Sequence, residues 1–281
     1  MTGVQTCALP ISIANLGYAD IRFSADVFPG DTLSVRSEII GLKENSSRRS
    51  GIVYVRSTAE NQNGREVLTW IRWVMVHKRD PNAESVQPAI PALYPVVLPE
   101  RLSIDHYTML TQNVTSMTGV TDLWDDYVVG ERIDHPGSMT VNDSDHSIAT
   151  RLYQNTAKAH FDGFGMASSG GQRLVYGGHI ISLCKALAYD GLENGLSIIA
   201  INSGSHVNPT FAGDTVACAT LVLDKIDLGV SHIGALRLRM IGVKDAPAAS
   251  IVFPDNRENK PAYPSNVVLD LDYTIVIPKQ P

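Results

Sequence analysis

Two short segments of the chain carry residue types that could do proton-transfer chemistry on an acyl group. The first contains Asn155 and His160, and a histidine on a loop can move protons near neutral pH. In the second, Gly177 and Gly178 open a strongly apolar stretch. Glycine amides at the start of a buried helix stabilise negative charge on an oxygen. Together the two segments predict enolate chemistry on an activated acyl group.

Two predicted helices must position these residues. The first, at residues 144–156, would be capped by Asp143, Ser144 or Asp145, because such side chains accept hydrogen bonds from first-turn amides. Its apolar stripe is Ile148, Ala149, Leu152 and Tyr153. The second, at 179–190, is apolar around most of its circumference, so we expect a buried helix wrapped by a sheet. The simpler alternatives are an ordinary histidine at His160 and glycines that only permit close packing.

The remaining sequence predicts antiparallel strands. Apolar residues favour strands at 32–40, 51–60 and 65–77, with an Asn-Gly hairpin turn between the last two, and again at 216–226 and 267–277. The string FPGDT at 28–32 recurs as FAGDT at 211–215, which indicates two copies of one unit. We interpret Gly-Asp-Thr as a tight turn that opens a strand.

A proline-rich segment separates two predicted domains. Five prolines between residues 80 and 99 forbid regular structure. We therefore predict a partial N-terminal domain at 13–79, a connection at 80–121 and a catalytic domain at 122–281. Only the second copy has predicted helical segments before its Gly-Asp-Thr. In the first copy, residues 1–19 are too few to form equivalent helices. Residues 1–12 look like translated sequencing-adapter sequence, so we expect a non-native segment and an N-terminally truncated chain.

Composition argues against several classes of function. The net charge of −6 comes with no basic stripe, so we expect no nucleic-acid partner. We also expect no membrane association, because no apolar run approaches the length that crosses a bilayer. Cys7, Cys184 and Cys218 lack metal-like spacing, so we expect no metal site and free thiols in a reducing, cytoplasmic compartment. No Lys or Arg precedes Arg22, unlike a secretory signal.

These residues resemble the MaoC-like, R-specific enoyl-CoA hydratases, whose signature is roughly GDxNPxH followed by a glycine-containing helix start. His160 matches the histidine of that signature, Asn155 stands where an Asp is usual, and Gly178 falls on the glycine. The resemblance implies an α+β double hotdog. Each half would be a curved antiparallel sheet wrapping a long helix, with the first half incomplete.

Longer strings narrow the resemblance over about residues 13–281. The strings RLYQNTAKAHF, YGGHIISL, NPTFAGDT, FPGDTLS and IRWVMVHKRDPNA look like the mesaconyl-CoA hydratase family, also called 2-methylfumaryl-CoA hydratases or β-methylmalyl-CoA dehydratases. This resemblance implies a hydro-lyase that reversibly hydrates mesaconyl-CoA to β-methylmalyl-CoA. It implies no cofactor, because the acyl-CoA thioester substrate itself carries coenzyme A, and it leaves homo-oligomer formation open.

The resemblance also implies roles for single residues. His160 is the expected general base and acid, and the Gly178 amide is the expected enolate-stabilising donor. Asn155 cannot ionise, so we expect it to orient water or the thioester carbonyl, while Asp145, Asp162 or another group shares proton transfer. A free carboxylate on the substrate favours a guanidinium partner. The substrate-binding candidates are Tyr176, Gly177, Gly178, His179, Arg173 as the first cation and Arg151 as the second.

Three other functions fit the same fold. One is hydration of a neighbouring acyl-CoA, such as itaconyl-CoA or a plain 2-enoyl-CoA. Another is a hotdog thioesterase, although many of those place a carboxylate on or near the central helix and residues 180–189 contain none. The third is a non-catalytic acyl-CoA binding subunit, which Asn155 in place of Asp keeps open.

Overall fold

The computed structural model describes residues 12–80, 82–85, 87–105, 107, 114–155, 157–166, 170–254 and 263–280. The chain forms two compact units, Met1–Ile104 with Ile198–Ser205, and Asp105–Ser197 with His206–Pro281. The first unit therefore includes a segment from the middle of the chain. The expected domain limits at residues 79 and 121 stay predictions. None of the helices in these ranges has the length and apolar character that membrane crossing requires.

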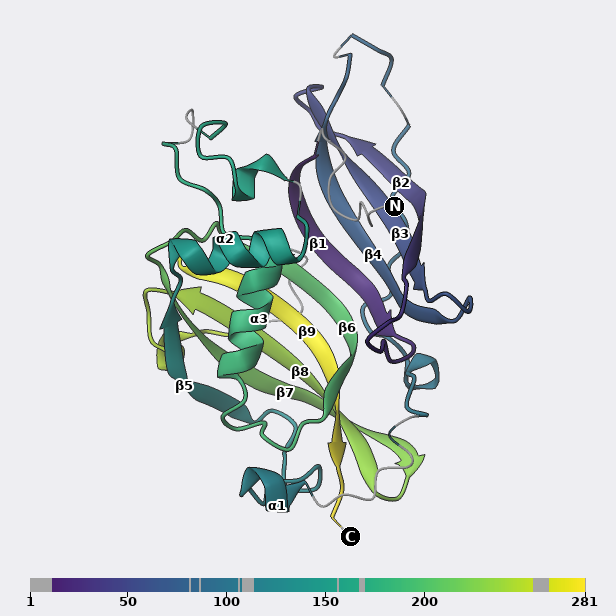
Figure 1. Cartoon of the computed structure of the whole chain (residues 1–281), viewed down its shortest axis with the longest axis vertical. Helices are drawn as coiled ribbons and strands as arrows, with labels where there is room; N and C mark the ends of the chain where they lie inside the picture. Colours follow the sequence, from purple (N-terminus) through teal and green to yellow (C-terminus); the bar gives the residue numbers. More distant parts are fainter. Residues whose placement is uncertain are drawn as a thin grey trace. The chain divides into compact units, whose positions relative to one another are not determined.

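The first unit is an antiparallel sheet (Figure 1). It contains β1 (Ser12–Phe23), β2 (Ser34–Glu44), β3 (Ser50–Glu60), β4 (Glu66–His77) and most of β6 (Ser197–His206), in the order β2-β3-β4-β1-β6. Alternation along β3 and β4 buries Val53, Val55 and Val74 in one cluster. Gly64 takes a φ of +74° in the turn between these strands, as the Asn-Gly pair predicts. The described residues of this unit contain no α-helix.

The proline-rich segment after β4 has little regular structure, as its composition predicts, apart from the short turn η1 (Pro99–Arg101). Leu42 of β2 and Ala89 exchange two backbone hydrogen bonds, both of 2.8 Å. The backbone amide of Val97 donates to Oδ1 of Asn202 at 2.8 Å. The segment is therefore fastened to the first unit at separate points.

The second unit is a sheet crossed by a helix (Figure 1). Its strands follow the order β9-β8-β7-β5, with bounds β5 (Arg132–Thr140), β7 (Thr215–Val230), β8 (Ile233–Lys244) and β9 (Val267–Pro278). All three strand pairs are antiparallel. The helices are α1 (Thr115–Thr118), α2 (Asp143–Leu152) and α3 (Gly177–Leu187), and α3 packs on β5 and β7. This is an α+β architecture.

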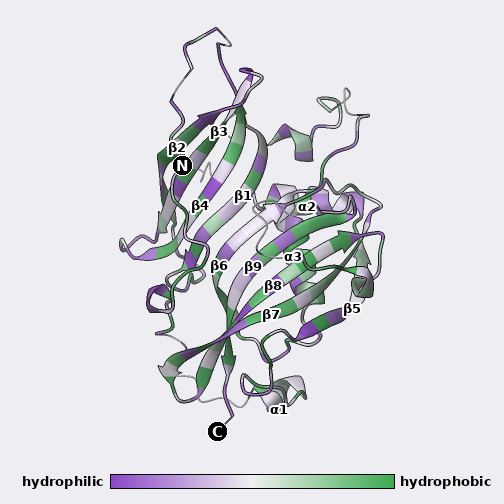
Figure 2. Cartoon of the chain, turned by 180° about the vertical axis from the view of Figure 1, so that it is seen from behind, coloured by the Kyte–Doolittle hydropathy of each residue, from purple (hydrophilic) through white to green (hydrophobic). Residues whose placement is uncertain are grey.

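Both faces of the second sheet are covered, which explains why β8 and β9 are hydrophobic along most of their length (Figure 2). On the side of α3, Cys184 packs closely against Gly242. A Cβ atom on Gly242 would lie 2.8 Å from the Sγ atom of Cys184. On the opposite side, Ile241 and Val243 pack with Ala248 and Ile251, which lie in and next to η4 (Ala248–Ser250). A strand buried on both faces needs apolar residues at successive positions.

The helix α3 is less buried than its sequence predicts. Ile180 and Cys184 are its buried residues, whereas Ser182 and Ala186 are exposed. The expected buried helix is therefore buried along one face only. The sheet meets one face of the helix, and apolar residues on the other faces keep part of their surface in solvent.

The repeated Gly-Asp-Thr string forms the same turn in both units. Gly30 and Gly213 have φ values of +99° and +100°, a region that glycine enters without steric cost. The carboxylates of Asp31 and Asp214 each accept a hydrogen bond from the amide of the phenylalanine three residues earlier, at 2.8 and 2.9 Å. The predicted structural role of the repeat is confirmed.

Candidate functional site

The helix α2 ends before the predicted site residue Asn155. Gln154 adopts a left-handed φ of +52°, which cannot continue a right-handed helix. Oδ1 of Asn155 then accepts the amide of Ala157 at 2.9 Å. The N-cap of α2 is Asn142, and Asp143 and Asp145 lie in the first turn. The prediction that Asp143, Ser144 or Asp145 is the N-cap is therefore wrong.

Of the apolar stripe predicted for α2, only Ala149 is buried. Ile148, Leu152 and Tyr153 are exposed, and the buried residues of the helix are His146, Ala149 and Thr150. The apolar residues do share one face of the helix, but the face that packs against the rest of the protein is the one that carries His146 and Thr150. This reversal buries a histidine that the sequence patterns did not single out.

His160 lies at the end of the short turn η2 (Lys158–His160), with its ring held against the strand-like residue Leu174. Nδ1 of His160 is 2.9 Å from the carbonyl oxygen of Leu174. A carbonyl oxygen only accepts, so Nδ1 carries the proton and the lone pair of the neutral ring is on Nε2. Burial lowers the pKa of His160, which keeps the ring neutral at pH 7. The histidine is therefore prepared to accept a proton at Nε2.

The two glycines at the start of α3 each face an aromatic ring. A Cβ atom on Gly177 would lie 2.5 Å from Cε1 of His206, and one on Gly178 would lie 2.5 Å from Cζ of Tyr176. Close packing, the simpler interpretation of these glycines, is therefore part of their role. Their amides belong to the first turn of α3, where backbone N–H groups have no partner within the helix.

Tyr176 connects the predicted histidine to this helix start. It is the N-cap of α3, and its ring centroid lies 5.8 Å from that of His160 in an edge-to-face arrangement. The same ring lies against Gly178. The structure thus brings His160, Tyr176 and Gly178 together.

Two further histidines, His146 and His206, gather around this point, and sequence reasoning missed both. Burial, followed by repulsion from His160, lowers the pKa of His206 to about 4. His146 is completely buried, and its charge would lower the pKa of both His160 and His179. The pKa of His179 falls mainly through burial, and Asp145 opposes the shift. The one available signal was that His206 lies two residues before the string NPTFAGDT, which carries part of the family resemblance.

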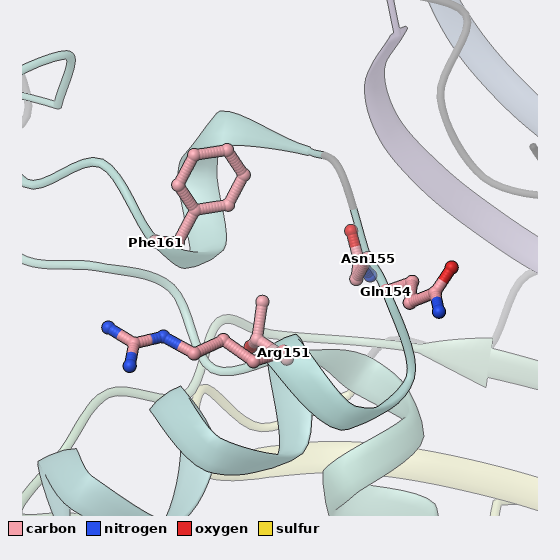
Figure 3. Close-up of a pocket in the computed structure, with 5 residues that line it drawn as sticks. Arg151, Gln154, Asn155 and Phe161 are labelled. Atoms are coloured by element: carbon pink, nitrogen blue, oxygen red, sulfur yellow. The ribbon is translucent and has the colours of Figure 1, made fainter. Parts of the chain in front are cut away.

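The two predicted cations have different surroundings. Arg173 forms an ion pair with Asp143 and thereby lowers the pKa of that carboxyl group. The guanidinium group of Arg151 forms no ion pair or hydrogen bond with another described residue. Arg151 instead lines an open pocket of about 310 Å³ together with Thr150, Gln154, Asn155 and Phe161 (Figure 3).

The two acidic alternatives for proton transfer both stabilise local turns. Asp145 accepts hydrogen bonds from Asn142 and Ser144, and Asp162 accepts the amide of Gly165 at 2.8 Å. Within the described ranges, no group of three or more His, Cys, Asp or Glu side chains is arranged to hold a metal ion. The thiols of Cys184 and Cys218 are free and buried, and Cys7 lies outside the described residues.

Comparisons with known proteins agree with this fold. No protein-family model matches the chain. A β-methylmalyl-CoA dehydratase from Chloroflexus aurantiacus is 48% identical over 278 residues, which cover 96% of this chain and 76% of that protein. A mesaconyl-CoA hydratase from Cereibacter sphaeroides is 45% identical, with 95% and 76% covered.

Solved structures give the same result. A MaoC-domain dehydratase from Chloroflexus aurantiacus superposes with a TM-score of 0.89 at 47% identity, covering 97% of this chain and 78% of the other. A Mycobacterium tuberculosis protein described as a double hotdog has a TM-score of 0.69 at 25% identity, with 97% and 77% covered. The fold is that of the double-hotdog, MaoC-like dehydratases, which confirms the predicted fold class. Within that class, the chain belongs to the family of β-methylmalyl-CoA dehydratase and mesaconyl-CoA hydratase.

Proposed function

We propose that this chain is a hydro-lyase that reversibly adds water to mesaconyl-CoA and forms β-methylmalyl-CoA. The names of two relatives with 48% and 45% identity support this reaction. The observation that carries the proposal in this chain is the fixed His160 imidazole, with Nδ1 bound to the Leu174 carbonyl at 2.9 Å and its basic nitrogen left on the other side of the ring.

The proposed reaction begins with proton transfer to His160. Nε2 removes a proton from water, and the hydroxide oxygen forms a bond to the β-carbon of the enoyl thioester. The π electrons move toward the thioester, which becomes an enolate with negative charge on its oxygen. A proton then adds to the α-carbon, so water is added overall without oxidation or reduction. His160 can return that proton once the enolate has formed.

The start of α3 is the proposed site of enolate stabilisation. The first-turn amides of Gly177 and Gly178 point away from the helix body, and the helix dipole adds positive potential there. One such donor typically lowers a barrier by about 3–4 kcal/mol. Oδ1 of Asn155 is engaged by the amide of Ala157, so its Nδ2 group is left to orient the water or the thioester carbonyl. Tyr176 and His179 would enclose the acyl group.

The same proposal covers cofactor, partners and compartment. The substrate supplies coenzyme A, and no other cofactor takes part in the proposed steps. A net charge of −6 disfavours binding to nucleic acid. The free thiols of Cys184 and Cys218 suit a reducing compartment such as the cytoplasm.

The test is turnover of mesaconyl-CoA by the purified chain. We expect loss of the enoyl absorbance, a product heavier by one water, and no release of free CoA thiol. His160→Ala should lower the rate by about 10²- to 10⁴-fold, as expected for loss of a general base, with an unchanged circular dichroism spectrum. His77→Ala, at an exposed site at the end of β4, is the matched control. Thiol release would instead identify a thioesterase, and full activity of His160→Ala would remove this residue from the mechanism.

A further inference from the structure

The pocket beside Asn155 has the chemistry of an anion site. It is lined by the last turn of α2, the turn after it and Phe161. Arg151 contributes a guanidinium group, and Gln154 and Asn155 contribute side-chain amides. Among the described residues that line the pocket, none carries a carboxylate. Hydrogen-bond donors without a competing negative charge favour a carboxylate or a phosphate.

The placement of the donors suits a small ligand with polar groups at both ends. In Figure 3 the side chain of Arg151 extends from α2 below the Phe161 ring, and it points away from Gln154 and Asn155, which follow the end of the helix. The volume of about 310 Å³ lies at the lower end of the range for small-molecule sites. It accommodates a short acyl chain better than a whole coenzyme A molecule.

The two candidate cations are not equivalent for this task. The charge of Arg173 is already balanced by Asp143, so binding a substrate carboxylate there would compete with an existing ion pair. Arg151 has no such partner among the described residues. It also shares its pocket with Asn155, and the pocket residue Phe161 follows directly after His160.

We propose that Arg151, rather than Arg173, binds the free carboxylate of a dicarboxylic acyl thioester and so selects diacid over monoacid substrates. This assignment rests on the proposed function, because it places the acyl group between Arg151 and Asn155. A guanidinium fork binds a carboxylate through two parallel hydrogen bonds. The plain acyl chain of a monoacid would leave this fork without its partner.

The test compares binding of two saturated thioesters that cannot be hydrated, succinyl-CoA and butyryl-CoA. Both have four-carbon acyl chains and the same coenzyme A, so they differ only in the terminal carboxylate. We expect Arg151→Met to weaken succinyl-CoA binding relative to butyryl-CoA by about 10- to 100-fold, as for loss of a charged hydrogen bond. In Arg151→Lys the ratio of the two affinities should lie between the values for the wild type and Arg151→Met, because lysine keeps the charge but cannot form two parallel hydrogen bonds. Arg173→Met is the matched control and should change this ratio much less.

Three results would overturn the assignment. Equal losses for both thioesters would place Arg151 at the phosphates of coenzyme A, and unchanged affinities would remove it from the site. A larger change of the ratio in Arg173→Met would transfer the role to Arg173. Because these ligands are not turned over, a chain that prefers succinyl-CoA but fails to hydrate mesaconyl-CoA would refute the proposed function and leave this inference standing.

Discussion

Replacing His206 with glutamine should make the chain less sensitive to acid. His206 packs against Gly177 at the start of α3, and burial is the main reason that its pKa falls to about 4. In the unfolded chain the same imidazole has a pKa near 6.5. Below pH 6.5 the unfolded chain therefore binds a proton that the folded chain rejects, and the free energy of unfolding falls with pH.

The size of this effect follows from the two pKa values. The folded value of about 4 lies about 2.5 units below the reference value of 6.5. Each unit corresponds to about 1.4 kcal/mol, so His206 should cost about 3 kcal/mol of stability once the pH has fallen below 4. Above pH 6.5 the cost vanishes, because both states hold the neutral ring. The effect is thus confined to the window between pH 6.5 and about 4.

Urea unfolding at a series of pH values between 7 and 4.5 measures this effect. The difference in unfolding free energy between the wild type and His206→Gln should shift by about 2–3 kcal/mol in favour of the variant across this range. A fixed offset at pH 7, caused by altered packing, does not affect the shift. His77→Gln supplies the baseline for removing an exposed histidine. Parallel curves for the wild type and His206→Gln would refute the link between burial at α3 and acid sensitivity.

Two further predictions concern the same region. His160 must be neutral to accept a proton, and its pKa is lowered by burial. The acidic limb of kcat/KM should therefore be centred below pH 6.5, and a limb centred above 6.5 would contradict this role. Gly177→Ala should cost about 1–3 kcal/mol, as overpacking does, because its methyl group meets the ring of His206. Gly177→Ala should lower the free energy of unfolding much less when it is made in the His206→Ala variant. Equal losses of stability in the wild type and in His206→Ala would mean that the added methyl group does not clash with His206.

The sequence patterns located β2, β3, β4, β7 and β9, but they did not identify β1, β5, β6 or β8. Alternating residues and an Asn-Gly turn located β3 and β4, and β2 began close to its expected start. In contrast, β5 contains Pro136 and Gly137, which disfavour a strand interior. Its register shifts between Asp134 and Ser138, and it lies at the end of the strand order, where an edge strand tolerates proline. Sequence periodicity alone does not identify such a strand.

The helices show a second limit of sequence reasoning. The periodicity of α2 correctly located a helix, but its face with Ile148 and Leu152 is exposed while His146 is buried. Periodicity reports which residues share a face, and only tertiary packing decides which face is covered. The same applies to α3, where one stripe of an almost wholly apolar helix meets the sheet.

The site was predictable in part. The residues at its centre, His160 and Gly178, were found from their types and from a resemblance, and the structure places both beside Tyr176. The catalytic and binding roles given to them stay predictions. His206 was missed because it belongs to no motif, and its approach to Gly177 depends on the fold of distant segments. The different surroundings of Arg151 and Arg173 could not be inferred either, since both ion pairing and pocket shape are tertiary properties.

The group that orients His160 has a consequence for the timing of the proposed reaction. Leu174 offers a neutral backbone oxygen, whereas the carboxylate of a Ser-His-Asp triad supplies a full negative charge that stabilises imidazolium. A protonated His160 would therefore be more acidic than a free imidazolium, because burial lowers its pKa, and would deliver its proton promptly. Such a residue favours a reaction in which it accepts a proton and transfers it to the substrate within the same turnover, as reversible hydration requires.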